Sequence, residues 1–256
     1  MGRFDSTQTR VTPVFRSLEG MPSPWLDRLL TLPTHGHPAR LSWAGRSTQV
    51  DEIKYGADEK PLPAPVKLLD WLIANIQDVT GKGLDSLSDH SRDKRRRLLA
   101  RDPDVIAEAR ARLTSNRADN QWFVLEGPSY PDVFISTPDL IVVIEGKRTE
   151  PVPTTATTWM SPRHQMLRHL DCALEMSGGR TVLGFFVVEN GIDGKVPEVW
   201  IRAAASTISQ EVLDGCLPHR TASERQAIAK GFLGVTTWQS VCREFMIDPQ
   251  SLPDTV

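Results

Sequence analysis

Glu145 and Lys147 end an apolar run that covers residues 140–144. A strand that is apolar at every position is buried on both faces, because each face must contact another layer of the protein. Ionised groups are rarely buried unless they are paired or bound to a metal, so folding alone does not explain charges here. Residues two apart in a strand project from the same face. The pattern therefore favours a shared site for metal-dependent phosphodiester chemistry, and the alternative is a structural ion pair at a strand end.

A second carboxylate must lie close to Glu145 if the two are to share one ion. Asp139 on the same strand would have its backbone about 20 Å away, at roughly 3.3 Å per residue. Asp132 fits better, because the residues between it and Glu145 read as a strand, a four-residue turn containing Asp139, and a returning strand. An even-numbered loop would set Asp132 opposite Val143 or Glu145, with side-chain roots about 5–8 Å apart on one face. Two carboxylates can span that gap with a cation between them, whereas an odd-numbered loop would break the parity.

Pro131-Asp132, followed at hairpin spacing by Glu145-x-Lys147, resembles the motif of the PD-(D/E)xK nucleases, a superfamily that includes many restriction endonucleases and repair or recombination exonucleases. The resemblance covers roughly residues 93–201. It implies an α/β (α+β) restriction-endonuclease-like fold, in which a mixed central β-sheet is flanked by helices. The motif then lies on the second and third strands, with a helix before the first strand and another after the third. Residues 122–125 are the expected first strand, and residues 163–177 are the expected following helix.

The helix after the motif carries two polar residues among its apolar ones. A helical projection of residues 163–176 places Gln165 and His169 inside the apolar arc, one turn apart, so both should face the sheet. The family often has a Gln-x-x-x-Tyr helix that lines the active site, and Gln165 followed by His169 resembles a variant in which the tyrosine is replaced. The role of His169 stays open, because a lone histidine is more often a satisfied core group. Arg163 in the first turn could contact a phosphate or reach solvent.

The resemblance implies a catalytic set of Asp132, Glu145, Lys147 and Gln165. Asp132 and Glu145 would hold Mg²⁺, for which Mn²⁺ is a possible substitute. The bound metal would lower the pKa of water and offset the charge that develops on the phosphorus. Lys147 would position the attacking water or stabilise the developing charge, and Gln165 would orient the lysine or that water.

A third metal ligand is expected from the helix before the first strand, because that helix sometimes donates an extra glutamate in this family. A helix is predicted from Asp102, a plausible N-cap with proline at the first helical position, to about Leu113. Glu108 is the only carboxylate inside its body, so Glu108 is the candidate ligand. Glu126, at the end of the expected first strand, is the rival.

Basic residues are concentrated just before the expected core. The formal charge of −2 does not favour binding to a polyanion, but the distribution of charge matters more than its sum. DNA is the expected partner, and a solvated helix face with interspersed acids is the alternative for this segment. The residues expected to contact nucleic acid are Arg95, Arg96, Arg97, Arg101 and Arg163.

The 256 residues are 39% hydrophobic and 24% charged, as in a globular protein. Three regions are predicted: a proline-rich irregular region over 1–66, a nuclease-like core with preceding helices over 67–205, and a helical extension over 206–256. A helix is expected over 67–80, and strands over 181–188 and 199–201. The apolar faces of the helical extension could pack on the core or form a homodimer contact.

Three scattered cysteines exclude a disulfide framework and a zinc site. The first residues lack the apolar segment of a signal peptide, and no run approaches the roughly 18 apolar residues of a membrane helix, so a cytoplasmic protein is expected. The sequence thus predicts a metal-dependent nuclease that hydrolyses phosphodiester bonds of DNA. The alternatives are a catalytically silent nucleic-acid-binding or scaffolding protein of the same fold, and a metal-dependent hydrolase of small phosphoesters. DNA versus RNA, and endonuclease versus exonuclease action, stay open.

Overall fold

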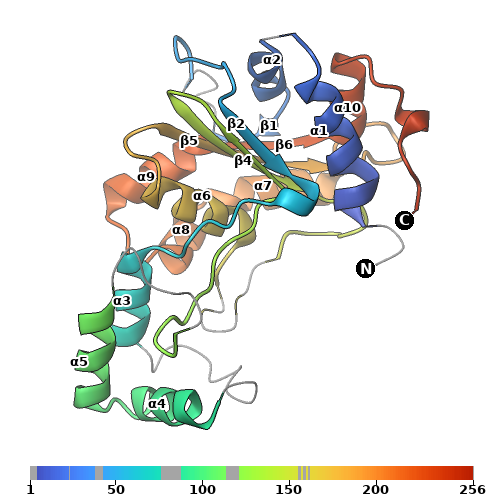
Figure 1. The fold of residues 1–256 in the computed structure, drawn as a ribbon. Helices are drawn as coiled ribbons and strands as arrows, with labels where there is room; N and C mark the ends of the chain where they lie inside the picture. Colours follow the sequence, from blue (N-terminus) through green and yellow to red (C-terminus); the bar gives the residue numbers. More distant parts are fainter. Residues whose placement is uncertain are drawn as a thin grey trace.

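A mixed six-stranded sheet forms the centre of the molecule, with helices packed on both faces (Figure 1). The computed structural model describes residues 5–22, 24–37, 43–75, 88–113, 121–154, 157, 160 and 162–255. The predicted α/β class, with a mixed central sheet flanked by helices, is confirmed. Among the described helices, none is long and apolar enough to cross a membrane.

The strand order across the sheet is β1-β6-β5-β4-β3-β2. β2, β3 and β4 are antiparallel neighbours, β4, β5 and β6 run parallel, and β1 pairs antiparallel with β6. Parallel strands need long crossover connections, and helices supply them here. The strands are β1 (Thr34–His35), β2 (Glu52–Tyr55), β3 (Val133–Ser136), β4 (Leu140–Gly146), β5 (Thr181–Val188) and β6 (Phe232–Thr237).

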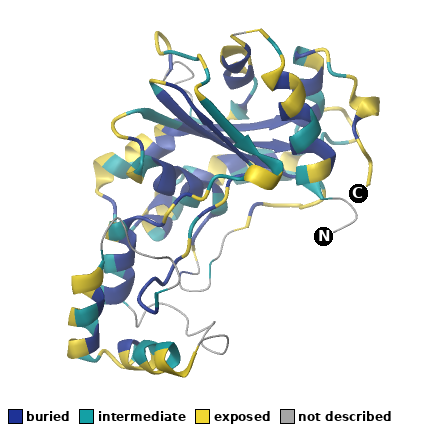
Figure 2. Cartoon of the chain, in the orientation of Figure 1, coloured by how far each residue is buried: buried dark blue, intermediate teal, exposed yellow. Residues whose placement is uncertain are grey.

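Two helical layers cover the sheet, and Figure 2 shows the inner strands of the sheet buried between them. One face packs against η1 (Thr7–Val11), α1 (Thr12–Glu19), α2 (Trp25–Thr31) and α10 (Trp238–Glu244). The other packs against α6 (Gln165–Glu175), α7 (Glu198–Thr207), α8 (Gln210–Cys216) and α9 (Ala222–Gly231). Two short 3-10 turns are η2 (Gly56–Asp58) and η4 (Pro249–Ser251).

The hairpin between β3 and β4 has the even-numbered turn that the sequence predicts. Ser136 pairs with Ile141, and the register runs on to Val133 opposite Ile144, so continuing it by one step sets Asp132 opposite Glu145. Thr137 closes the turn, since its hydroxyl accepts from the backbone N–H of Leu140 at 2.8 Å.

Asp139 is a turn residue, as predicted. Its carboxylate accepts from the backbone N–H of Ser47 at 2.7 Å. That bond fastens the turn to the segment leading into β2.

The predicted first strand at 122–125 is wrong. These four residues are buried, but they pack against α3 (Val66–Ala74), α4 (Asp89–Leu99) and α5 (Pro103–Arg112) in a core of their own. A short apolar run signals burial without specifying which partner buries it. β2 takes the position beside β3 instead, and α3, α4 and α5 lie apart from the sheet (Figure 1).

The predicted irregular region over 1–66 is also wrong, because it supplies α1, α2 and two strands of the sheet. The predicted helical extension over 206–256 contains β6, whose six residues are all buried between β5 and β1. Residues 199–201 belong to α7, where three consecutive alanines at 203–205 favour a helix over a strand. The predicted helix over 67–80 is observed as α3, and its expected continuation from residue 76 lies outside the described residues.

The C-terminal aromatic residues settle one alternative. Phe232, Trp238 and Phe245 are buried within the chain. They pack in the two cores that flank the sheet. These side chains therefore belong to the interior and do not form a dimer contact.

Gly234 in β6 has a strong requirement for glycine. Its φ is +103°, and an added Cβ would lie 2.0 Å from the carbonyl oxygen of Thr34. We expect Gly234→Ala to lower the free energy of unfolding by about 3 kcal/mol or more, because positive-φ strain and a backbone clash add. Gly45→Ala is the matched control: φ is +75° and nothing lies within 4 Å, so its cost should be about 1 kcal/mol. Urea unfolding of both variants measures the difference, and equal costs would contradict the clash.

Candidate active site

Four polar side chains meet at the end of β4. The carboxylate of Glu145 accepts from Gln165 Nε2 at 2.6 Å and from Lys147 Nζ at 2.9 Å, both at Oε1. His169 Nε2 lies 2.9 Å from Oε2. Glu145 continues the strand face of Ile141 and Val143, which packs against α6. The helix therefore presents Gln165 and His169 to Glu145, as the predicted inward arc requires.

Asp132 joins this group from the residue before β3. Its Oδ2 accepts from the backbone N–H of Gly146 at 2.7 Å. Gly146 allows the close packing, because a Cβ there would lie 2.7 Å from Trp238 Cζ2 and 2.9 Å from Val11 Cγ2. The indole N–H of Trp238 also donates to the carbonyl of Lys147 at 3.2 Å. Both carboxylates are therefore held against one rigid strand end.

The two carboxylates differ in their electrostatics. Burial, followed by the negative charge of Glu145, raises the pKa of Asp132 well above its usual value. Burial alone would also raise the pKa of Glu145, but hydrogen bonds and charges from His169 and Lys147 outweigh it and hold this pKa low. For Lys147, burial opposes the charged form, yet Glu145 prevails and the pKa is raised. Glu145 is thus the ionised partner, and Asp132 carries the cost of a second negative charge.

A third carboxylate, Glu59, contributes to the site and was missed by sequence reasoning. It follows η2 directly after β2. Burial and then the charge of Glu145 raise the pKa of Glu59, and Glu59 in turn raises that of Asp132. Glu59 and the half-exposed Tyr130 line a cavity of about 920 Å³. The only sequence signal for Glu59 is its position after β2, a strand in the region that the sequence predicts to be irregular.

A smaller cavity of about 200 Å³ opens beside Lys147. Lys147 and Arg148 line it just after β4, and Glu189 and Asn190 line it just after β5. Ligands of open α/β sheets bind at the carboxyl ends of parallel strands. The cavity gives a small ligand access to the Lys147 side of the site.

Asp132 and Glu145 form a centre of two carboxylates. In the parts of the chain that the structure describes, no three carboxylate, histidine or cysteine side chains gather closely enough to hold a metal ion. Glu108, the expected third ligand, does not join the site. It lies on α5, where it pairs with Lys94 at 2.5 Å and Arg112 at 3.4 Å. Because β2 takes the position beside β3 that was expected for residues 122–125, α5 does not occupy the position from which the extra ligand was expected.

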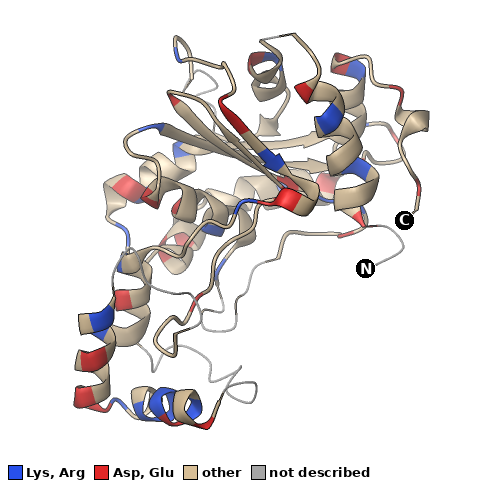
Figure 3. Ribbon diagram, viewed as in Figure 1, with Lys and Arg blue, Asp and Glu red and all other residues tan. Residues whose placement is uncertain are grey.

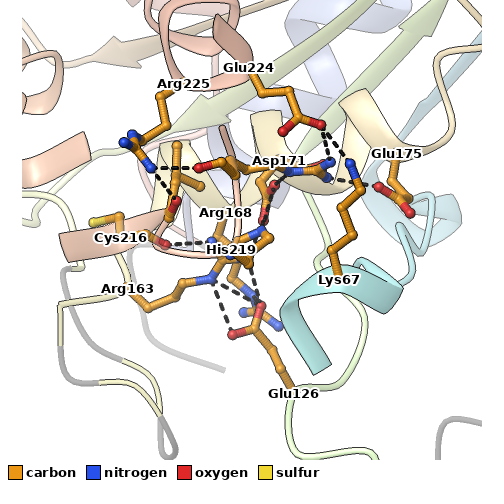
Figure 4. Close-up of polar contacts among 12 residues, drawn as sticks. Lys67, Glu126, Arg163, Arg168, Asp171, Glu175, Cys216, His219, Glu224 and Arg225 are labelled. Carbon is orange, nitrogen blue, oxygen red and sulfur yellow. Dashed lines mark hydrogen bonds and ion pairs between the residues drawn. The ribbon is translucent and has the colours of Figure 1, made fainter. Parts of the chain in front are cut away.

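Arg163 is not available to a phosphate, contrary to the prediction. Its guanidinium is fully buried, where it binds the carboxylates of Glu126 at 3.1 Å and Asp171 at 2.7 Å (Figure 4). Arg168 reaches Glu126 as well, at 3.2 Å. Glu126, the rival third ligand, is therefore held by two arginines. Arg163 is close to Gln165 in sequence, but its side chain points to Glu126 and Asp171 and not to Glu145.

Of the predicted DNA contacts on and just after α4, some are bound to other groups of the protein, and Arg96 is exposed to solvent. Figure 3 shows the concentration of basic residues on this helix. Arg95 donates to the carbonyl oxygens of residues 122 and 124 at 2.8 and 3.2 Å, Arg97 pairs with Asp102 at 2.9 Å, and Arg101 donates to the carbonyl of Ala74. Arg96 is exposed. Arg95 thus holds the small core of this unit together, and Arg96 is the member best placed to contact a partner.

Comparisons of the chain with models of protein families, with curated proteins and with solved structures find no match. Function is therefore inferred from the geometry and chemistry of the site.

Asp132→Asn should stabilise the metal-free protein at neutral pH. Because the folded-state pKa of Asp132 is raised, stability falls as the pH rises above the unfolded-state pKa of about 3.9. Asparagine is neutral and keeps an oxygen for the Gly146 N–H. We expect a gain of about 0.5–2 kcal/mol at pH 7. The gain should disappear near pH 3, where aspartate is protonated in both states. Urea unfolding in EDTA at the two pH values measures it.

Glu145→Gln is the matched variant and should have the opposite sign. The folded-state pKa of Glu145 is lowered, so its stabilising effect is present above the unfolded-state pKa of about 4.3 and is lost as the pH falls through the folded-state value. Removing one partner of a buried ion pair costs about 3–5 kcal/mol, and we expect a loss of this order at pH 7 that shrinks in acid. A destabilising Asp132→Asn or a stabilising Glu145→Gln would contradict this division of charge.

Proposed function

We propose that this protein is a metal-dependent nuclease that hydrolyses phosphodiester bonds of DNA. The observation that carries the proposal is the convergence of Asp132, Glu145, Lys147 and Gln165 at the end of one buried strand. Buried ionisable groups whose pKa values are shifted by burial and by neighbouring charges are typical of functional sites. The element order adds support for a restriction-endonuclease-like fold: α1, three antiparallel strands β2 to β4, then α6 and the parallel strand β5.

The residues of the site fit a hard divalent cation such as Mg²⁺, with Mn²⁺ as its substitute. Mg²⁺ is commonly bound through one or two carboxylates together with water and substrate phosphate oxygens, which is the donor set that Asp132 and Glu145 offer. The raised pKa of Asp132 is caused first by burial and then by Glu145, with a further contribution from Glu59. A bound cation would offset this negative charge, lower the pKa of water and polarise a phosphate oxygen.

The remaining side chains have distinct roles in cleavage. Lys147 provides an ammonium, fixed by Glu145, that stabilises negative charge developing on the phosphate oxygens. Gln165 holds Glu145 through its Nε2, and its Oε1 is buried without a hydrogen-bond partner among the described residues. An acceptor in that position can take a hydrogen bond from an attacking water and orient it. Both roles require that substrate and water reach the site, and the cavity lined by Lys147 offers one approach.

A hydrolase of small phosphoesters is a second candidate. It is favoured by the local pairing of the basic residues on and just after α4, since Arg95, Arg97 and Arg101 all bind groups of their own unit. The small cavity beside Lys147 is also large enough for a single phosphoester group. The placement of Asp132 beside Glu145, where burial and the neighbouring charge raise the pKa of Asp132, argues against a silent binding protein, because nothing in binding alone requires two adjacent carboxyl groups.

Cleavage assays test the proposal directly. The protein is incubated with supercoiled, linear and single-stranded DNA, with RNA and with a small phosphodiester, with and without Mg²⁺ or Mn²⁺. We expect metal-dependent products from DNA, and a loss of at least about 100-fold in rate for Lys147→Ala. Lys195→Ala, in an exposed loop, is the control and should keep the full rate. Full activity of folded Lys147→Ala would reject the assignment, and cleavage of the small ester alone would favour the second candidate.

Arg96→Gln tests whether α4 contacts the polymer. If Arg96 binds a phosphate, its removal should weaken DNA binding for all sequences and reduce the slope of log K against log salt by about 1. The unfolding transition should not move, because Arg96 is exposed. Arg95→Gln should behave in the opposite way, with lower stability of the helical unit, since Arg95 binds two carbonyl groups there. An unchanged salt slope in Arg96→Gln would remove α4 from the DNA interface.

A further inference from the structure

A buried chain of hydrogen bonds runs from Ser129 through His169 to Glu145. Ser129 Oγ lies 2.7 Å from His169 Nδ1, and His169 Nε2 lies 2.9 Å from Glu145 Oε2. All three side chains are almost wholly excluded from solvent. They come from three separate parts of the chain: the loop before Asp132, the middle of α6 and the end of β4. Their alignment therefore depends on the folded sheet and helix together.

The chemistry of the groups sets the direction of the bond between His169 and Glu145. The Glu145 carboxylate is paired with the Lys147 ammonium, and an ionised carboxylate can only accept. His169 therefore donates from Nε2–H to Glu145. The other ring nitrogen, Nδ1, is held by the hydroxyl of Ser129.

Ser129 is held in place for this task by its backbone. Its N–H and its carbonyl both pair with Leu62, each at 2.8 Å, in an isolated antiparallel bridge. The segment just before it is fastened to α6, since Arg168 donates to the carbonyls of Gly127 and Pro128 at 3.1 and 2.9 Å. The hydroxyl thus has a fixed position relative to the helix that carries His169.

We propose that Ser129 and His169 are positioning residues: Ser129 orients the His169 ring through Nδ1, and His169 thereby fixes the Glu145 carboxylate through Nε2. Residues that bind metal-ligating groups from behind orient those groups, and their loss commonly weakens metal affinity about 10–100-fold. With Gln165 and Lys147 both on Oε1, the bond from His169 to Oε2 is the one that stops the carboxylate from rotating. The effect on metal affinity rests on the proposed function, whereas the orientation of the ring does not.

Nitrogen NMR of the imidazole side chains tests the orientation of the His169 ring in the metal-free protein at pH 7. His169→Gln identifies the His169 signals by their disappearance. We expect a single form with a proton on Nε2 in the wild type, and a mixture of forms in Ser129→Ala, because Nδ1 loses its hydrogen-bond partner. An Nε2 without a proton in the wild type, or a Ser129→Ala spectrum identical to that of the wild type, would overturn the proposal.

Calorimetric titration with Mn²⁺ tests the effect on Glu145. His169→Gln keeps an N–H donor and should bind Mn²⁺ within a few-fold of the wild type, whereas His169→Leu should bind about 10–100-fold more weakly. Equal affinity of the leucine variant and the wild type would overturn the positioning role. Absence of Mn²⁺ binding by the wild type would instead reject the proposed function, and the NMR result would then decide the orientation of the His169 ring by itself.

Discussion

The burial of the Glu145 carboxylate is the constraint on which the site depends. An ionised group in the interior must be supplied with hydrogen-bond donors or it destabilises the fold. Three donors reach Glu145. Two come from α6, and the third is Lys147, which directly follows β4. The position of α6 over the sheet, the end of β4 and the loop before β3 all serve this one carboxylate. Its neighbour Asp132 lacks the same support, which leaves an excess of negative charge at the strand end.

A buried ion network holds these parts in register from the opposite side of α6. Asp171 accepts from Arg163 at 2.7 Å and from Arg220 at 2.7 Å, and Glu126 binds Arg163 and Arg168. Figure 4 shows that the network links α6 to the segment around Glu126 and to the segment around His219. Charges this deeply buried are stable only as a complete set. The network therefore couples the segment leading to Ser129 and Asp132 to the helix that faces Glu145.

The arrangement of the chain explains how distant segments share one site. Glu59 follows the strand β2 near the N-terminus, Asp132 precedes β3, and Gln165 begins α6. They meet because β2, β3 and β4 are neighbours and α6 crosses over to β5. The unit of α3, α4 and α5 lies between β2 and β3 in sequence but packs around its own core. A long insertion of this kind leaves the sheet intact while moving much of the basic charge away from the candidate site.

From the sequence alone, the local features of the site could be predicted. The apolar run ending in Glu145 and Lys147, the parity of the turn after Ser136, and the inward arc of Gln165 and His169 depend on strand and helix periodicity, which is written in neighbouring residues. The tertiary structure alone decided which strand lies beside β3, that Arg163 is buried in an ion network, and that Ser129 and Glu59 belong to the site. Those outcomes depend on contacts between segments far apart in the chain, and single-sequence patterns carry no signal for such pairings. The sequence predicts that an apolar run such as 122–125 is buried. It does not predict which part of the chain buries that run.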